Sequence, residues 1–226
     1  MKKDHTNWKI IIQDLRELII NYFRNDIMKT ELSLSVSFGI NILYAAFKVV
    51  MGLFFHSLWY LTIALYYIIL SVTRFHLIRS FMVDGSLRMG YHREITTGIL
   101  LLGLNVILMG MTILTISNQV TLIVPVGFIY VTILYTIYCF VDCITNFVRD
   151  KGKTDSIHTT SKAIILVTVF ISVYCMQIYL LQKFSTDILF KNHMNGLTGS
   201  AVVILINLTG LYLVIRGISH HRKIEW

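Results

Sequence analysis

Residues 163–181 read AIILVTVFISVYCMQIYLL, a run that contains no charged side chain. A bilayer core of ~30 Å needs ~20 apolar residues in a helix, so this run is long enough to cross it. The sequence predicts six such spans in all, at 32–55, 57–77, 95–117, 120–147, 160–182 and 197–216. Because the apolar runs are continuous rather than alternating, a membrane β-barrel is excluded. We therefore expect an all-α, polytopic membrane protein.

The composition leads to the same class of protein. Of the 226 residues 55% are hydrophobic and only 14% are charged, whereas soluble domains carry about 25% charged residues. The mean hydropathy is +0.68. These values exclude a disordered chain, a collagen-like chain and an ordinary cytosolic enzyme. The 3 cysteines all lie in apolar runs and are expected to be buried thiols.

Basic residues are distributed unevenly between the two sides of the predicted spans. Of the 20 Lys and Arg residues, all but Lys48, Lys183 and Lys191 fall on one side, including Arg74, which is assigned to the loop between the second and third spans. Positive charge is retained in the cytoplasm, so we expect a multi-pass protein of the cell membrane with both termini cytoplasmic. This placement accounts for the net charge of +8 without nucleic acid as a partner.

The predicted spans divide the chain into three parts. Residues 1–31 form a cytoplasmic N-terminal segment, residues 32–216 the six-helix transmembrane domain, and residues 217–226 a short basic cytoplasmic tail. Within the first part, residues 8–24 have apolar side chains at the spacing of one helix face. This pattern predicts an amphipathic helix in the membrane interface, although docking to a partner protein remains open.

Polar residues inside the spans are the candidate functional residues, because charge within a bilayer is costly. Lys48 is expected in the outer half of the first span and Asp142 in the inner half of the fourth. At 1.5 Å per residue their depths differ by roughly 10 Å or more, so no direct ion pair is expected. Each side chain either extends toward the nearer interface or lies on a polar path through the bundle.

Three amides, Asn41, Asn105 and Asn207, are expected near the midplane of three different spans. Such amides either hold helices together, at perhaps ~0.6 kcal/mol each, or converge on a small polar cavity. An acid, a base and a nucleophile are not found together within the spans, and Gly-rich phosphate loops and a Gly-x-Ser-x-Gly elbow are absent, so no catalytic residue, metal ligand or cofactor is predicted.

One pattern resembles a known family. Asn41, Lys48, Gly52 and Ser57 precede the second span, and Met89-Gly90-Tyr91-His92-Arg93-Glu94 opens the third. This pattern resembles the transmembrane domain of the cation diffusion facilitator family of metal/proton antiporters. The resemblance implies six spans with both ends inside.

The resemblance does not extend to the metal ligands of that family. Its Asp and His ligands on the second and fifth spans have no counterpart in residues 62–71 or 163–168. The chain also resembles uncharacterised six-span membrane proteins of anaerobic Gram-positive bacteria, which implies no particular function.

Two functions therefore remain open. The first is a transporter-like bundle that moves a small solute or a proton through a polar cavity. Its candidate cavity residues are Asn41, Lys48, Asn105, Asp142 and Asn207. The alternative is a non-transporting membrane subunit, scaffold or sensor that binds a partner protein. The lipid bilayer is the expected surrounding, and a homodimer is left open.

Overall fold

The computed structural model describes residues 26–83, 90–117, 124–149, 151–152 and 155–224. Within these residues all regular structure is α-helical. The helices are α2 (Asp26–Phe54), α3 (Leu58–Val83), α4 (Gly90–Ser117), α5 (Val126–Arg149), α6 (Ser156–Phe184) and α7 (Ile188–Ile224). The predicted interfacial helix at 8–24 lies outside the described residues.

The prediction of six spans is confirmed in number and order. Each helix is long and apolar enough to cross a membrane, from Ser35–Phe54 in α2 to Ile188–His220 in α7. This length and composition fit a multi-pass integral membrane protein, since a helix satisfies its backbone polar groups internally except at its two ends.

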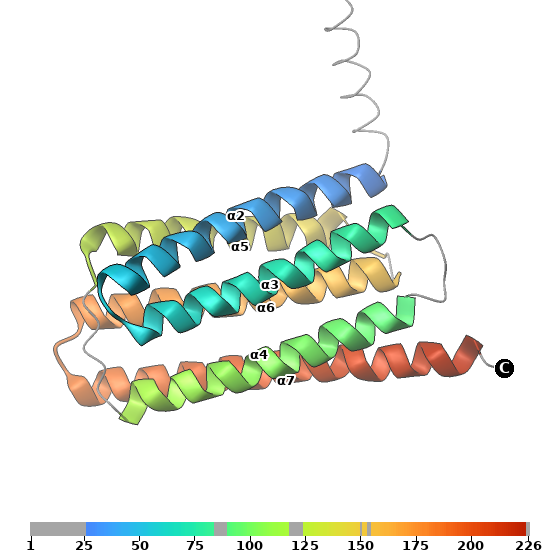
Figure 1. The fold of residues 1–226 in the computed structure, drawn as a ribbon. Helices are drawn as coiled ribbons and strands as arrows, with labels where there is room; N and C mark the ends of the chain where they lie inside the picture. Colours follow the sequence, from blue (N-terminus) through green and yellow to red (C-terminus); the bar gives the residue numbers. More distant parts are fainter. Residues whose placement is uncertain (1–25, 84–89, 118–123, 150, 153–154, 225–226) are drawn as a thin grey trace, which may run out of the picture.

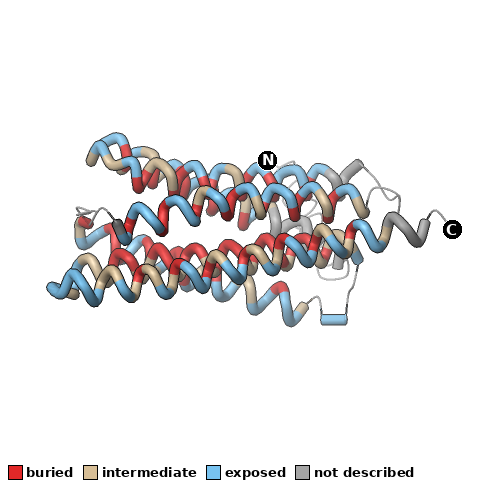
Figure 2. The backbone as a smooth tube through the Cα atoms, turned by 90° about the horizontal axis from the view of Figure 1, so that it is seen from below, coloured by how far each residue is buried: buried red, intermediate tan, exposed pale blue. Residues whose placement is uncertain are grey.

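Successive helices run in opposite directions (Figure 1). The backbones lie closest between α4 and α7, then between α2 and α3 and between α5 and α6, whereas α2 and α5 meet mainly through side chains. The end of the bundle where α2 begins and α7 ends is called the terminal end. The opposite end, which holds the turn from α2 to α3, is called the hairpin end. Figure 2 shows the buried parts of each helix turned inward and the exposed parts outward.

The turn at the hairpin end is as tight as the sequence predicts. Residues 55–57 join α2 to α3, and Ser57 N–H donates to the Gly52 carbonyl at 3.0 Å. His56 adopts a positive φ of 48°. A Cβ at Gly52 would lie 2.7 Å from the Leu61 side chain, so the absence of a side chain there lets α3 approach α2 closely.

Two helix bounds differ from the predicted spans for local reasons. α5 begins at Val126 rather than at 120, directly after Pro125, which has no N–H and favours the start of a helix. The predicted spans 95–117 and 120–147 imply a very short connection between the third and fourth spans. This prediction is wrong, because residues 124 and 125 are not helical. α7 begins at Ile188 rather than at 197 because Asp187 caps it: its Oδ1 accepts from the N–H of Leu189 at 2.9 Å and of Phe190 at 3.2 Å.

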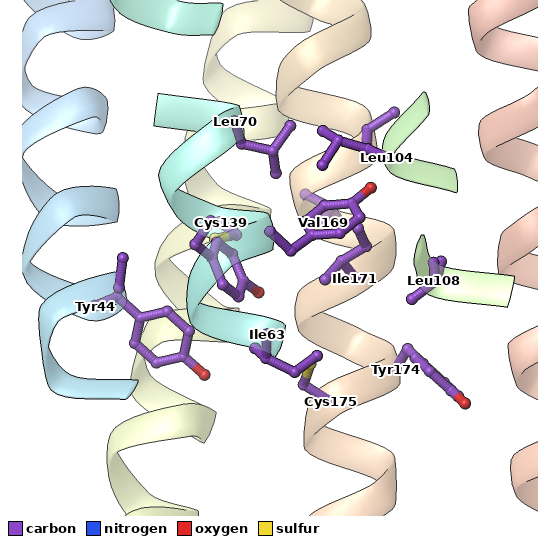
Figure 3. Packing of buried hydrophobic residues seen from close by; sticks show 14 of the residues in the cluster. Tyr44, Ile63, Leu70, Leu104, Leu108, Cys139, Val169, Ile171, Tyr174 and Cys175 are labelled. Carbon is purple, nitrogen blue, oxygen red and sulfur yellow. The ribbon is translucent and has the colours of Figure 1, made fainter. Parts of the chain in front are cut away.

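The core centres on α6. In the most apolar stretch of α6, 61% of the residues are buried, compared with 28% in that of α7. Figure 3 shows Ile63 and Leu70 of α3 on one side of α6, and Leu104 and Leu108 of α4 on the other. α6 thus separates the α2–α5 side of the bundle from the α4–α7 side.

Glycines allow α4 and α7 to pack closely. A Cβ at Gly98 would lie 2.8 Å from the carbonyl oxygen of Gly210, and one at Gly217 would lie 3.0 Å from that of Tyr91. By contrast, nothing lies within 4 Å of a Cβ built at Gly103. The two helices therefore meet backbone to backbone, as small residues permit in membranes.

Candidate functional site

The candidate site is a line of polar side chains between α2 and α5. On α2 the members recur at three- and four-residue spacing, which places them on one helix face. As the residue numbers increase along α2, the residue numbers of their partners on α5 decrease, as expected for antiparallel helices. We call this line the polar track; it consists of Ser37, Asn41, Tyr44, Lys48, Arg74, Thr132, Tyr135, Asp142, Asn146, Arg149 and Tyr179.

At the terminal end of the track, Ser37 connects a guanidinium to a carboxylate. Arg74 is 1% exposed, and its Nη1 donates to Ser37 Oγ. Its Nη2 donates to Thr168 Oγ1 of α6 at 2.8 Å. Ser37 Oγ in turn donates to Asp142 Oδ2 at 3.0 Å. The opposite charges of Arg74 and Asp142 are thus joined through one hydroxyl.

The track continues from Asp142 to the last residue of α5. Asn146 Nδ2 donates to Asp142 Oδ1 at 2.8 Å, and Arg149 Nη2 donates to Asn146 Oδ1. From Thr132 to Arg149, at 1.5 Å per residue, the track covers about 25 Å of a bilayer core of ~30 Å.

Asn41 lies next to Arg74 and accepts hydrogen bonds from its guanidinium. The amide satisfies both of its neighbours when its oxygen faces the guanidinium, and this orientation is assigned from the hydrogen-bond partners. Oδ1 then accepts from Arg74 Nε and Nη1, each at 3.2 Å, while Nδ2 donates to the Tyr135 hydroxyl at 2.5 Å.

Three tyrosine rings occupy the middle of the track. The rings of Tyr44 and Tyr135 are stacked, with centroids 3.7 Å apart and planes 3° from parallel. Tyr67 of α3 meets both edge-on, at 5.0 and 5.5 Å. The hydroxyl of Tyr67 is buried and has no hydrogen-bond partner among the described residues. At this point ring stacking, rather than a hydrogen bond, joins the two halves of the track.

Lys48 occupies the half of the track nearest the hairpin end. Its side chain is 0% exposed, so it does not extend to the interface. Nζ donates to Tyr179 Oη at 2.9 Å and to Thr132 Oγ1 at 3.4 Å. It also lies 4.4 Å from the ring centroid of Tyr179 and 4.8 Å from that of Tyr44. Among the described residues, its partners are hydroxyls and aromatic faces rather than carboxylates.

A groove opens beside the tyrosine rings, toward the outside of the bundle. It has a volume of about 640 Å³ and lies between α2 and α5. Its wall is apolar apart from Tyr44, Tyr135 and Tyr138. The first two rings therefore face the groove on one side and the track on the other.

The five candidate residues from the sequence fall into two groups. Asn41, Lys48 and Asp142 lie along the polar track. Asn105 instead donates from Nδ2 to the Val203 carbonyl at 2.9 Å, between α4 and α7, and Asn207 is half-buried on α7. The α4–α7 pair lies beyond α3 and α6 from the track (Figure 1).

Two buried charges were missed by the sequence reasoning. The assignment of Arg74 to a loop is wrong, because α3 continues to Val83 and buries this side chain. Glu94 of α4 is 0% exposed, and its Oε1 lies 3.3 Å from Arg216 Nε of α7. The signal for Arg74 was its position inside the predicted span at 57–77. Glu94 is thus a buried acidic residue within a spanning helix, whereas Asp142 is half-buried.

Within the described residues, no group of three or more His, Cys, Asp or Glu side chains could hold a metal ion. Comparisons with models of known protein families and with curated proteins find no match to this chain.

Proposed function

We propose that this chain is a transporter-like protein of the cell membrane that moves a small anion or a proton-coupled solute along the polar track. The observation that carries the proposal is the track itself, which covers most of the bilayer thickness and holds Lys48 and Arg74 buried and Asp142 half-buried. Ionisable groups at this depth are costly and mark pathways for ions and protons. Since cations outnumber carboxylates here, an anion is favoured over a metal cation.

The stacked rings of Tyr44 and Tyr135 serve as the gate in this proposal. They close the track where its two hydrogen-bonded halves meet, 3.7 Å apart. The groove behind them provides space into which the rings could turn. The Tyr67 hydroxyl beside them, which has no hydrogen-bond partner among the described residues, is suited to bind a water molecule once the gate opens. No catalytic role is proposed, since Ser37 and Asn146 already engage the Asp142 carboxylate.

The orientation belongs to the same proposal. In this proposal both termini are cytoplasmic, because most basic residues of the sequence fall on one side of the predicted spans, and the sequence pattern of residues 8–24 is that of an interfacial helix. The proposal also includes a six-helix bundle like that of the cation diffusion facilitator family, without the metal site of that family.

A second function, docking of a partner protein, is favoured by one observation. Arg79, His92 and Lys151 are exposed at the terminal end. An acidic partner would find these side chains accessible while the track stays closed. Crosslinking and pull-down from native membranes distinguish this function, since a stoichiometric partner is expected only in this case.

Transport is tested in proteoliposomes that contain the purified full chain. Uptake of radiolabelled phosphate, acetate and chloride is measured under an imposed potential, with a pH-sensitive dye inside the vesicles to detect protons. We expect Lys48→Met to reduce the flux at least ~10-fold, because the track loses a charge worth several kcal/mol at this depth. Lys183→Gln, at an exposed lysine of the hairpin end, is the matched control. Equal flux in wild type and Lys48→Met removes Lys48 from the mechanism, and no flux above empty vesicles overturns the proposal.

A further inference from the structure

A second groove lies on the opposite side of α6 from the track. It has a volume of about 520 Å³ and runs between α5, α6 and α7. Leu166 and Phe170 of α6 face Leu205 and Leu208 of α7 along most of its length. This groove does not touch the polar track, so its role is independent of the proposed function.

Apart from Thr209, the polar side chains of this groove gather at its terminal end. Lys162 and Arg216 line it there, together with the hydroxyls of Thr159 and Tyr212. Arg216 Nη1 donates to Thr159 Oγ1 at 2.7 Å and to Tyr212 Oη at 3.1 Å, which fixes the guanidinium in place. Each hydroxyl also carries an O–H that a phosphate oxygen can accept.

Among the described residues, two cations line this end of the groove and one carboxylate, that of Glu94, lies beside them. Glu94 approaches Arg216 Nε at 3.3 Å and offsets one positive charge. His220 Nδ1 lies 3.5 Å from the other Glu94 oxygen. The ammonium of Lys162 lies 5.9 Å from the ring centroid of Phe147, at the rim of the groove. Lys162 and Arg216 therefore both present positive charge to an anion at this end of the groove.

The length of the groove matches one leaflet of a membrane. From Arg216 to Leu205, at 1.5 Å per residue, it extends for about 16 Å. Half of a bilayer core of ~30 Å is about 15 Å. An acyl chain that fills the apolar part would thus end near the midplane, and its headgroup would lie beside Lys162 and Arg216.

We propose that this groove binds one anionic phospholipid, with its phosphate held by Lys162 and Arg216 and one acyl chain lying between α6 and α7. Charge complementarity favours this occupant over a zwitterionic lipid. Basic pockets between spans near the interface recognise acidic headgroups in the same way. A lipid bound there joins α5, α6 and α7 at the terminal end.

The proposal is tested by native mass spectrometry of the full chain in mild detergent, with added dioleoyl phosphatidylglycerol or dioleoyl phosphatidylcholine. We expect the wild type to bind the anionic lipid about fivefold more tightly, as one cation near an acidic headgroup provides. Lys162→Gln is expected to remove this preference, while Lys162→Arg and the distant control Lys183→Gln retain it.

A second variant tests the apolar part of the same groove. Leu208→Trp should fill the groove and reduce the binding of both lipids without a change in the melting temperature of lipid-free protein. Three outcomes would overturn the proposal: equal affinity of the wild type for the two lipids, an unchanged preference in Lys162→Gln, or a lipid-free dimer that Leu208→Trp converts to monomer. The last outcome would assign the groove to a second copy of the chain.

Discussion

The two helix pairs on either side of α3 and α6 are held together by different means. α4 and α7 meet through glycines, so that Gly98 and Gly210 bring their backbones into contact. α2 and α5 are instead joined by side chains, through hydroxyls, an amide, charges and stacked rings, with a groove left between them. Close backbone packing has one geometry, whereas side chains can change rotamers and partners. The difference indicates that α4–α7 is the fixed part of the bundle and α2–α5 the part that can open.

The largest effect is expected from breaking the polar track at Arg74. Arg74→Gln removes a fully buried cation that Ser37 links to the Asp142 carboxylate, which should cost about 3 kcal/mol or more. The free energy of unfolding in detergent measures this loss. Arg79→Gln, at an exposed arginine of the same helix, is the matched control and should change it little. Equal stability of the two variants would show that the track does not hold α2 to α5.

A smaller effect is expected from separating α4 and α7. Gly98→Ala places a Cβ 2.8 Å from the Gly210 carbonyl oxygen, a backbone atom that can move only with its helix. Overpacking of this kind costs about 1–3 kcal/mol. Gly103→Ala, on the same helix with nothing within 4 Å, should be neutral or slightly stabilising. Thermal unfolding compares the two, and similar melting temperatures would contradict backbone contact at this seam.

A smaller loss of stability is expected when one hydroxyl is removed from the polar track. Thr132→Val keeps the shape of the side chain but deprives Lys48 Nζ and Tyr44 Oη of a partner at 3.4 Å. We expect a loss of about 1 kcal/mol in the free energy of unfolding. Thr209→Val is the control, since the Thr209 hydroxyl is exposed and bonds only within its own helix, to the Leu205 carbonyl. A neutral Thr132→Val would mean that the Tyr179 hydroxyl and the aromatic faces are sufficient to hold the lysine.

The smallest effect is expected from an amide at the glycine-packed seam. Asn105→Leu removes the hydrogen bond to the Val203 carbonyl, and interhelical bonds of this kind average ~0.6 kcal/mol in membranes. Asn207→Leu, half-buried on α7, provides the comparison and should change the melting temperature less. A loss of several kcal/mol in Asn105→Leu would indicate that this seam also depends on polar side chains.

The sequence predicts the spans well because hydrocarbon imposes a length and an apolar composition on each of them. It does not predict the rotation of a helix about its own axis. Asn105 and Asn207 therefore seemed as suitable for a shared cavity as Asn41, although they lie on the α4–α7 pair. For the same reason Arg74 was assigned to a loop: near the end of an apolar run, only packing shows whether a cation turns inward or toward the interface. The starts of α5 and α7 are also not predicted correctly, because each is determined by a single residue, Pro125 for α5 and Asp187 for α7.

The long sequence separations within the track have a consequence for membrane insertion. Lys48 and Arg74 emerge on the first two spans, yet Tyr179 follows Lys48 by 131 residues and Thr168 follows Arg74 by 94. Until α5 and α6 are synthesised, the two cations must enter the membrane without these partners, and each charge at the centre of a span costs about 2.5–3.5 kcal/mol at insertion. A chain truncated after α3 should thus insert poorly. The early spans depend for their retention on helices that have not yet been made.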